Sequence, residues 1–283
     1  MSVSIAEALR QASRALDQGG VADGRREAGS LLSHVTGKDR TFLISHAEDL
    51  LSDDELERFG DVVARRAAGE PAQYITGVQD FFGRTFRVTS DVLIPRPETE
   101  LLVEAALELM GEKAVVCDVG TGSGCIAVTL LCERSDAHAV ALDVSEAALE
   151  VARQNARELL VEPRIDLRVS DCFSALDQGA DIFDLIVSNP PYVSQNMLPG
   201  LQREVRDHEP LVALSPGADG LSVIRRLLTE GPQFIRGNGY LIMEIGFDQG
   251  ERVQALIDKN VWTLLRIVPD LQGIPRIVVL QKR

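Results

Sequence analysis

The spacing of apolar residues divides the chain into two parts. Over about the first 77 residues, apolar positions recur every three or four residues, which is typical of amphipathic helices. Ser4 with Glu7, and Ser52 with Glu55, have the spacing of a capping box, which marks a helix start. The expected helices cover roughly residues 4–18, 21–35, 41–47 and 52–68. This pattern predicts an all-α helical bundle over residues 1–77.

A short segment with a different pattern follows the bundle. The run from Phe81 to Val88 is rich in β-forming residues around Gly83, and it predicts a β-hairpin that ends in Val92-Leu93-Ile94. We expect residues 78–94 to form a β-hairpin linker between two domains.

From about residue 114 onward, short apolar runs alternate with helical patterns, as in a parallel sheet with crossover helices. The last two runs are only about eight residues apart, too close for a crossover helix, so they are expected to form an antiparallel hairpin at the sheet edge. We therefore predict for residues 95–283 an α/β fold, the seven-stranded doubly wound, Rossmann-like sheet of methyltransferases. Strands are expected near residues 114–119, 138–143, 165–170, 183–188, 239–245, 262–268 and 276–281, and helices start near Gly124, Ser145 and Leu221.

Composition narrows the class of protein. The 283 residues are 45% hydrophobic and 25% charged, as in ordinary globular proteins, and the net charge of −14 argues against a non-specific nucleic-acid binder. No apolar run approaches the about 20 residues of a membrane span, and no leader is evident, so we expect a cytoplasmic protein. The four cysteines form no C-x-x-C pair and are interpreted as free thiols, and His34 and His46 are isolated, so no metal site is expected.

A glycine-rich loop follows the first strand of the second domain. Gly120-Thr121-Gly122-Ser123-Gly124 lies between a strand and a helix, where glycines let the backbone turn sharply and approach a nucleoside-bearing ligand. The spacing from Gly122 also fits a dinucleotide fingerprint, whereas Asp118 and the G-x-G-x-G run resemble the S-adenosylmethionine loop of class I methyltransferases. Because S-adenosylmethionine has no pyrophosphate, the loop would pack closely against its methionine portion.

Acidic residues end the next two strands. Asp143 ends the second strand and is expected to accept hydrogen bonds from ribose hydroxyls, although it could also be an N-terminal acid of the following helix. Asp171 and Cys172 follow the third strand, where an acid and an apolar neighbour could bracket an adenine ring. A solvated loop acid is the alternative interpretation of Asp171.

The turn Asn189-Pro190-Pro191-Tyr192 follows the fourth strand. Two prolines end the strand and hold the Asn189 amide and the Tyr192 ring in a rigid turn at the ligand-binding edge of the sheet. An amide or exocyclic amino nitrogen is a poor nucleophile because its lone pair is delocalised. The Asn189 side-chain oxygen and the Pro190 carbonyl could each accept one N–H hydrogen bond and orient such a nitrogen, and Tyr192 offers a face for a planar group. A plain turn is the alternative.

Alternating prolines precede the helix expected over residues 101–110. Arg96, Glu98 and Thr99 lie in this segment, Pro95–Glu100, and are candidate substrate-binding residues. An ordinary helix N-terminus would also explain the acids of this segment. Both interpretations stay open.

These motifs together resemble the PrmC/HemK family of release factor glutamine methyltransferases over nearly the whole chain. The resemblance implies transfer of methyl from S-adenosyl-L-methionine to the glutamine side-chain amide nitrogen (N5) in the Gly-Gly-Gln motif of class 1 peptide chain release factors, with S-adenosyl-L-homocysteine as product. The matching segments are the bundle, Gly69–Gly77, Phe81–Val88, Val92–Glu100, Gly120–Gly124, Asn189–Tyr192, Glu204–Pro210, Met243–Gly246 and Asp270–Arg276.

The resemblance also assigns site residues. Gly120–Gly124, Asp143, Cys172 and Asn189 would contact the cofactor, and Asn189–Tyr192 would hold the glutamine. Position 172 departs from the family pattern, in which a larger apolar or aromatic residue is frequent, so adenine packing by Cys172 is in doubt.

Other functions fit the sequence less well. A relative that modifies a ribosomal protein shares the strand-end motif but differs over Pro95–Glu100, and a DNA adenine N6-methyltransferase would need a basic DNA-binding surface. An oxidoreductase lacks a suitable acid–base pair near the strand ends. We expect a monomer whose bundle recognises the release factor.

Overall fold

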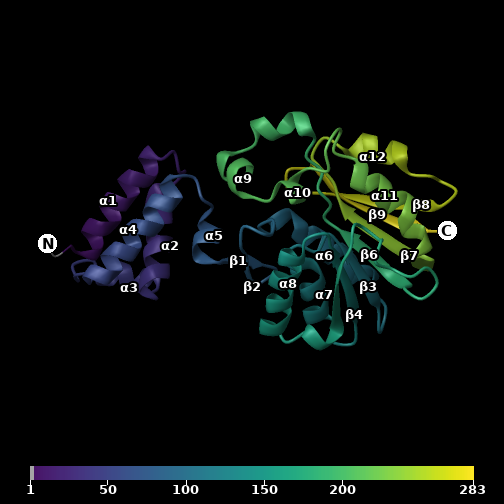
Figure 1. Ribbon diagram of the computed structural model, residues 1–283, viewed down its shortest axis with the longest axis horizontal. Helices are drawn as coiled ribbons and strands as arrows, with labels where there is room; N and C mark the ends of the chain where they lie inside the picture. Colours follow the sequence, from purple (N-terminus) through teal and green to yellow (C-terminus); the bar gives the residue numbers. More distant parts are fainter. Residues whose placement is uncertain (1–2) are drawn as a thin grey trace. The chain divides into compact units, whose positions relative to one another are not determined.

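The computed structural model describes residues 3–283, and the chain divides into two compact units (Figure 1). Unit 1 contains the chain up to Val78 together with Gln202–His208. Unit 2 contains Gln79–Leu201 and Glu209–Arg283. No sequence feature indicated that residues 202–208 would group with the bundle.

Unit 1 is helical, as its apolar period predicted. Its helices are α1 (Ile5–Gln18), α2 (Gly24–Thr36), α3 (Arg40–Ser45), α4 (Asp53–Ala67), α5 (Ala72–Thr76) and α9 (Arg203–His208). They enclose a core that includes Leu16, Leu31, Leu32 and Phe59.

The helix starts of unit 1 follow from local hydrogen bonds. The Ser52 hydroxyl accepts from the Glu55 N–H at 3.2 Å, and the Glu55 carboxylate accepts from the Ser52 N–H at 2.8 Å, so the expected capping box is complete. At Ser4 only the first of these two bonds forms. Helix α2 begins at Gly24 and not near residue 21 as the sequence predicts. Asp23 has a left-handed φ of 53°, which is incompatible with a right-handed helix through this residue.

The hairpin at the start of unit 2 consists of β1 (Val78–Phe81) and β2 (Arg84–Arg87). The prediction that it ends in Val92-Leu93-Ile94 was wrong, because residues 92–94 belong to no strand. Pro95 follows directly and has no N–H for a strand ladder, so this segment packs as irregular backbone with Val92 and Ile94 buried.

The sheet of unit 2 has the predicted α/β architecture. Within the described residues it has seven strands in the order β5-β4-β3-β6-β7-β9-β8. All neighbouring pairs are parallel except β7 with β9 and β8 with β9, which confirms the expected antiparallel hairpin at the edge. The strands are β3 (Val115–Val119), β4 (His138–Asp143), β5 (Ile165–Val169), β6 (Phe183–Ser188), β7 (Ile235–Glu244), β8 (Trp262–Pro269) and β9 (Pro275–Lys282).

Helices cover both faces of this sheet (Figure 1). Alternate residues of one strand belong to different cores: Val116 packs with α6 and α7, whereas Cys117 packs with α11 and α12. The remaining helices of unit 2 are α6 (Glu100–Leu109), α7 (Cys125–Glu133), α8 (Glu146–Glu158), α10 (Leu211–Leu214), α11 (Ser222–Glu230) and α12 (Gly250–Leu256), with 3-10 turns η1 (Pro97–Thr99), η2 (Glu162–Arg164), η3 (Gln195–Gly200) and η4 (Gly231–Gln233).

Candidate active site

A cavity of about 420 Å³ lies at the carboxyl ends of the parallel strands. Here β3 lies between β4 and β6. The chain runs from β3 outward to β4 and β5 and then returns to the other side of β3 at β6, which leaves a crevice at the carboxyl ends of β3 and β6. The volume is in the range of about 300–1,000 Å³ that small-molecule sites occupy. The cavity is lined by residues 91–93, 95, 99, 119–123, 125, 126, 143–145, 148, 170–172, 189–191, 212, 213, 215, 216 and 223.

The glycine loop between β3 and α7 forms one wall of the cavity. Gly120, Gly122 and Gly124 all have positive φ, of 76°, 54° and 79°, which other residues rarely adopt. A Cβ atom at Gly120 or Gly122 would meet nothing within 4 Å, whereas at Gly124 it would lie 3.1 Å from the Ala152 Cβ of α8. The first two glycines therefore leave room beside the cavity, and the third allows close helix packing.

The buried carboxylate of Asp118 stabilises this loop. Asp118 accepts hydrogen bonds through Oδ2 from the Thr121 hydroxyl at 2.7 Å and from the Ala127 N–H at 3.3 Å. Burial raises the pKa of Asp118 to about 7, and those two hydrogen bonds oppose the rise. Thr121, predicted to contact the cofactor, lines the cavity but uses its hydroxyl to anchor the loop.

Asp143 lies at the cavity wall, where β4 ends. Its Oδ2 accepts from the Gly122 N–H at 2.8 Å and its Oδ1 from the Ser145 N–H at 2.9 Å. Burial raises the pKa of Asp143, and hydrogen bonds from backbone N–H groups oppose that change. Each carboxylate oxygen has a second lone pair, so Asp143 can still accept from ligand hydroxyls.

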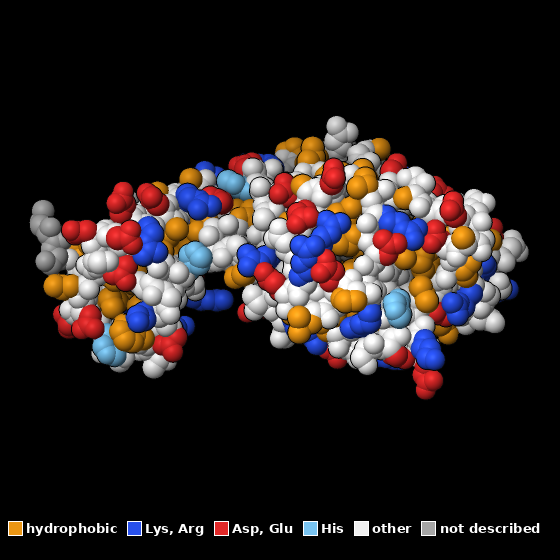
Figure 2. Space-filling view, turned by 60° about the horizontal axis from the view of Figure 1, so that its bottom comes forward, with side chains coloured by type: hydrophobic (Ala, Val, Ile, Leu, Met, Phe, Trp, Pro, Cys, Tyr) orange, Lys and Arg blue, Asp and Glu red, His pale blue; other side chains and the backbone are white. Residues whose placement is uncertain are grey.

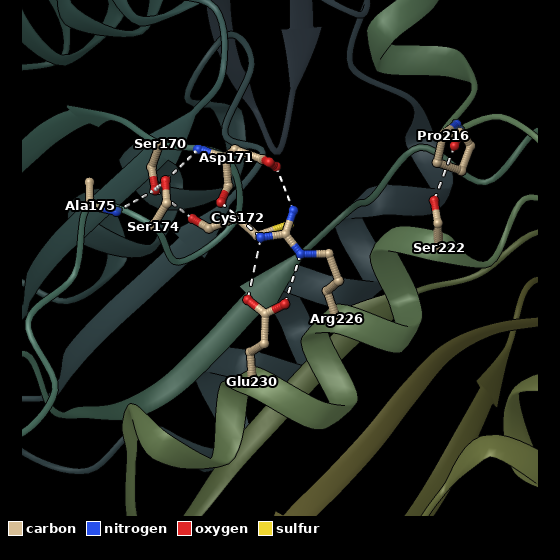
Figure 3. Close-up of polar contacts among 9 residues, drawn as sticks. All are labelled: Ser170, Asp171, Cys172, Ser174, Ala175, Pro216, Ser222, Arg226 and Glu230. Atoms are coloured by element: carbon tan, nitrogen blue, oxygen red, sulfur yellow. Dashed lines mark hydrogen bonds and ion pairs between the residues drawn. The ribbon is translucent and has the colours of Figure 1, made fainter.

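Asp171 and Cys172 lie in the loop after β5, opposite α11 (Figure 3). Arg226 of α11 donates to the Asp171 Oδ1 at 2.6 Å and to its backbone carbonyl at 3.1 Å, and it also pairs with Glu230. Cys172 has a φ of 51°, and burial raises the pKa of its thiol to about 11. Arg226, which does not line the cavity, thus holds this loop in place. The Cys172 thiol lines the cavity as a small apolar side chain.

The Asn-Pro-Pro-Tyr turn follows β6 at the opposite wall. Asn189, Pro190 and Pro191 line the cavity, together with Thr99 from η1. The Asn189 Nδ2 donates to the Thr99 Oγ1 at 3.1 Å. Thr99 is buried and donates in turn to Glu244 at 2.7 Å.

Four predicted site residues lie outside the cavity lining: Gly124, which packs against α8, and Tyr192, Arg96 and Glu98. The Tyr192 hydroxyl donates to Glu244 at 3.4 Å, and burial raises the pKa of Tyr192. Arg96 pairs with the buried carboxylate of Glu209 at 2.5 Å. Glu98 lies in η1 beside Thr99 and is half-buried. The structure brings together Thr99 and the turn, but it does not bring Arg96 or Glu98 to the cavity.

Sequence reasoning missed several residues of this region. Val144, Val92 and Pro216 line the cavity, and Val144 is an exposed apolar residue directly after Asp143. Glu244 was noted for its motif alone, although an acid that ends an apolar strand is the same signal that identified Asp143. The cavity residues at 91–93, 215 and 216 lie in irregular backbone, and those at 212 and 213 lie in the short helix α10, so none of them ends a strand as Asp143 does.

The cavity fits the cofactor that the motifs predict. Its walls combine the open glycine loop, apolar groups such as Val144 and Val223, and the Asp143 carboxylate. These are the groups that an adenosyl ligand with an apolar ring face and two ribose hydroxyls requires.

Two further observations concern the part of the chain from residue 3 onward. No cluster of three or more His, Cys, Asp or Glu suited to a metal ion occurs there, and all four cysteines are free. No helix in this range is both long and apolar enough to cross a membrane.

Two solved structures of methyltransferases share this fold. The hMettl16 catalytic domain aligns with a TM-score of 0.59 at 17% identity, covering 78% of this chain and 81% of that one. A methyltransferase from Pyrococcus furiosus aligns with a TM-score of 0.53 at 17% identity, covering 79% of this chain and 98% of that one. Residues 97–203 match the family described as methyltransferase small domain. The fold is therefore that of an α/β Rossmann-like methyltransferase.

The family follows from relatives that match almost end to end. Residues 7–77 match the PrmC N-terminal domain. The release factor glutamine methyltransferase of Koribacter versatilis is 43% identical over 99% of both chains, and that of Cereibacter sphaeroides is 45% identical over 96% of both. The chain belongs to the release factor glutamine methyltransferase family.

Proposed function

We propose that this protein methylates the side-chain amide nitrogen (N5) of the glutamine in the Gly-Gly-Gln motif of class 1 peptide chain release factors. The methyl donor is S-adenosyl-L-methionine, held at the glycine loop and Asp143. The observation that carries this function is the Asn189 amide at the cavity wall, whose Nδ2 is bound by Thr99. The Asn189 Oδ1 is thereby left to accept from a substrate NH₂ group.

The turn supplies orientation rather than a base. Asn189 Oδ1 and the Pro190 carbonyl accept the two N–H hydrogens of the glutamine amide and direct its nitrogen toward the methyl group. S-adenosyl-L-methionine supplies a methyl group on a sulfonium, which leaves as S-adenosyl-L-homocysteine when the nitrogen lone pair forms the new N–C bond. The extra proton on the nitrogen then passes to solvent. Tyr192 supports the turn from behind through its hydrogen bond to Glu244.

The surface charge disfavours a nucleic-acid substrate. The net charge is −14, and acidic and basic side chains of the described residues are intermingled on the face shown in Figure 2. A duplex-DNA enzyme needs a basic surface for backbone contacts. The proposed substrate is accordingly a protein, and we propose that the enzyme acts as a monomer in the cytoplasm, where release factors work.

Residues 1–77 are proposed to recognise the release factor outside its glutamine loop, and residues 95–283 to carry out the transfer, with residues 78–94 as linker. This division is supported by a separate helical core in unit 1 and by the cavity lying entirely in unit 2. The Gly-Gly-Gln loop itself offers few side chains for contacts, so the enzyme's affinity for the release factor has to come from other parts of that protein.

The decisive assay incubates the protein with methyl-labelled S-adenosyl-L-methionine and one of four acceptors. These are a class 1 release factor, the same factor with its motif glutamine changed to alanine, a ribosomal protein preparation and duplex DNA. Label is expected in the intact release factor alone. Equal labelling of the glutamine-to-alanine factor, or labelling of DNA, would overturn the proposal.

Asn189→Ala tests the role of the turn. We expect the rate of transfer to fall by about 10²–10³-fold, the usual loss when one preorganised hydrogen-bonding group of an active site is removed. The unfolding temperature should stay near that of the wild type, because the removed amide lies at a cavity wall. Turnover at the wild-type rate would refute the two-acceptor arrangement.

A further inference from the structure

A buried carboxylate lies directly behind the Asn-Pro-Pro-Tyr turn. Glu244 ends β7 and is only 1% exposed. Strands β6 and β7 pair Ser188 with Met243, so Asn189, which follows β6, lies next to Glu244, the last residue of β7. Glu244 does not line the cavity, and in the methyl transfer described above it serves only as the acceptor for the Tyr192 hydroxyl.

Hydrogen bonds connect Glu244 to the turn by two routes. Its Oε2 accepts from the Thr99 hydroxyl at 2.7 Å, and its Oε1 accepts from the Tyr192 hydroxyl at 3.4 Å. Thr99 also accepts from the Asn189 Nδ2 at 3.1 Å. A short chain of donors and acceptors therefore runs from Glu244 through Thr99 to Asn189.

The donor-to-acceptor direction of these hydrogen bonds determines which end of the Asn189 amide faces the cavity. An ionised carboxylate only accepts, so the single hydroxyl hydrogen of Thr99 goes to Glu244. The Thr99 oxygen can then only accept, and the group that it meets on Asn189 must be the NH₂. The Asn189 Oδ1 is consequently the end that remains for a substrate N–H.

We propose that Thr99 and Glu244 are positioning residues, which hold the Asn189 amide with its oxygen toward the substrate nitrogen. The proposal rests on the proposed function and deepens it, because the same amide would otherwise be free to rotate. Rotation would present the Asn189 NH₂ to the substrate NH₂, and two donors would then face each other without a hydrogen bond.

The arrangement depends on the charge of Glu244. A protonated Glu244 can donate to the Thr99 oxygen, which frees the Thr99 hydrogen for the Asn189 Oδ1 and stabilises the rotated amide. Ionised Glu244 stabilises the productive orientation, so activity is present at higher pH and is lost as Glu244 takes up a proton.

The surroundings of Glu244 place this transition near neutrality. Burial raises the pKa of Glu244 to about 7. The hydrogen bond from Thr99 of η1, the charge of Arg276 on β9 and the hydrogen bond from Tyr192 after β6 oppose this rise, whereas the charge of Glu98 on η1 adds to it. Arg276 is itself paired with Asp270 at 2.9 Å, which moderates its effect on Glu244.

Three variants of the full chain test the proposal: Thr99→Val, Thr99→Ser and Glu244→Gln. For each, kcat and KM are measured with a release factor at saturating S-adenosyl-L-methionine between about pH 6 and about pH 9, where an active-site pKa shows as a limb of the profile. Cofactor affinity by calorimetry and the unfolding temperature are measured in parallel, and they report whether a variant is folded and binds its cofactor.

The comparison of kcat with cofactor affinity distinguishes a positioning role of Thr99 from a purely structural one. Thr99→Val loses about 10–100-fold in kcat, a loss of orientation alone, while its cofactor affinity stays within about twofold of the wild type. Thr99→Ser keeps the hydroxyl and restores kcat. The wild-type kcat falls below about pH 7, and Glu244→Gln abolishes this acid limb, because an amide cannot be ionised.

Two outcomes would overturn the proposal. One is a wild-type kcat in Thr99→Val, and the other is an acid limb that persists unchanged in Glu244→Gln. If Thr99→Val does not fold, the comparison of pH profiles between the wild type and Glu244→Gln still decides. Failure of the wild type to label the motif glutamine would instead refute the proposed function itself, so the two failures can be told apart.

Discussion

Asp143 shows how one side chain serves both the loop and the ligand. Its two oxygens accept from the Gly122 and Ser145 N–H groups, at 2.8 and 2.9 Å, and so join the glycine loop to the start of α8. Its place at the end of a strand was evident from sequence, because a carboxylate after an apolar run stands out. The two interpretations weighed there, ribose acceptor or helix N-terminal acid, are compatible, since the N–H bonds leave lone pairs toward the cavity.

Removal of this carboxylate should weaken cofactor binding. We expect Asp143→Ala to reduce the affinity for S-adenosyl-L-methionine by about 1–3 kcal/mol, the range for hydrogen bonds to a charged group. Calorimetric titration measures the change directly. Asp166→Ala is the matched control, because Asp166 is also a strand acid but pairs with Arg168 and does not line the cavity. Equal affinity of the Asp143 variant and the control would contradict the ribose assignment.

The unit of β3, glycine loop and α7 acts as one element of the site. Backbone N–H groups of Gly120 and Thr121 donate to the Leu142 carbonyl at 2.8 and 2.9 Å, so the loop is tied to the end of β4. Gly124 then starts α7 close to α8. The glycine pattern predicted this loop from sequence, but it did not show that the three glycines have different tasks.

An added methyl group at Gly124 should disturb both the fold and the site. Alanine at a φ of 79° is strained, and its Cβ would lie 3.1 Å from the Ala152 Cβ. We expect Gly124→Ala to lower the free energy of unfolding by about 1–3 kcal/mol and to weaken cofactor binding.

Denaturant unfolding and calorimetry test this expectation. Gly111→Ala is the control, because Gly111 has an ordinary φ and a Cβ there would meet nothing within 4 Å. Unchanged stability of the Gly124 variant would show that the start of α7 can shift without cost.

At the scale of the whole molecule, unit 1 is not a simple N-terminal piece. Gln202–His208 belongs to it, and Arg66 of α4, which is buried, pairs with Glu204 at 2.6 Å and with Glu27 at 2.8 Å. Removal of residues 1–77 would leave Glu204 without this partner. Point variants therefore test the recognition role of the bundle better than truncation does.

Ile44 on α3 is a suitable position, because this large apolar side chain of unit 1 is 69% exposed. If the bundle recognises the release factor, Ile44→Asp should raise KM for the intact factor by about fivefold, or ~1 kcal/mol, with little change in kcat. A short Gly-Gly-Gln peptide should be methylated as well as by the wild type. Leu160→Asp, an 86% exposed position in unit 2, is the control. A KM that rises equally for peptide and protein would contradict the recognition role.

The sequence alone determined the features that depend on neighbouring residues. The seven strands, the helices that follow Pro95–Glu100, Gly124, Ser145 and Leu221, the glycine loop, the acid at Asp143 and the Asn189–Tyr192 turn were predicted because periodicity, glycine and proline act within a few residues. The helices α10 and α12 were not predicted. These short-range signals state which positions are buried and where a strand ends.

Only the tertiary structure decided which of these ends meet. Thr99 and Glu244 are 145 positions apart, and Asn189 and Thr99 are 90 apart, yet three side chains form one hydrogen-bonded chain. Contacts between distant segments also explain three other features. They bring parts of residues 91–95 and 212–216 to the cavity wall, pair Arg96 with Glu209, and group residues 202–208 with unit 1. Packing brings distant segments together according to strand order and side-chain shape, and no local period along the chain records that order.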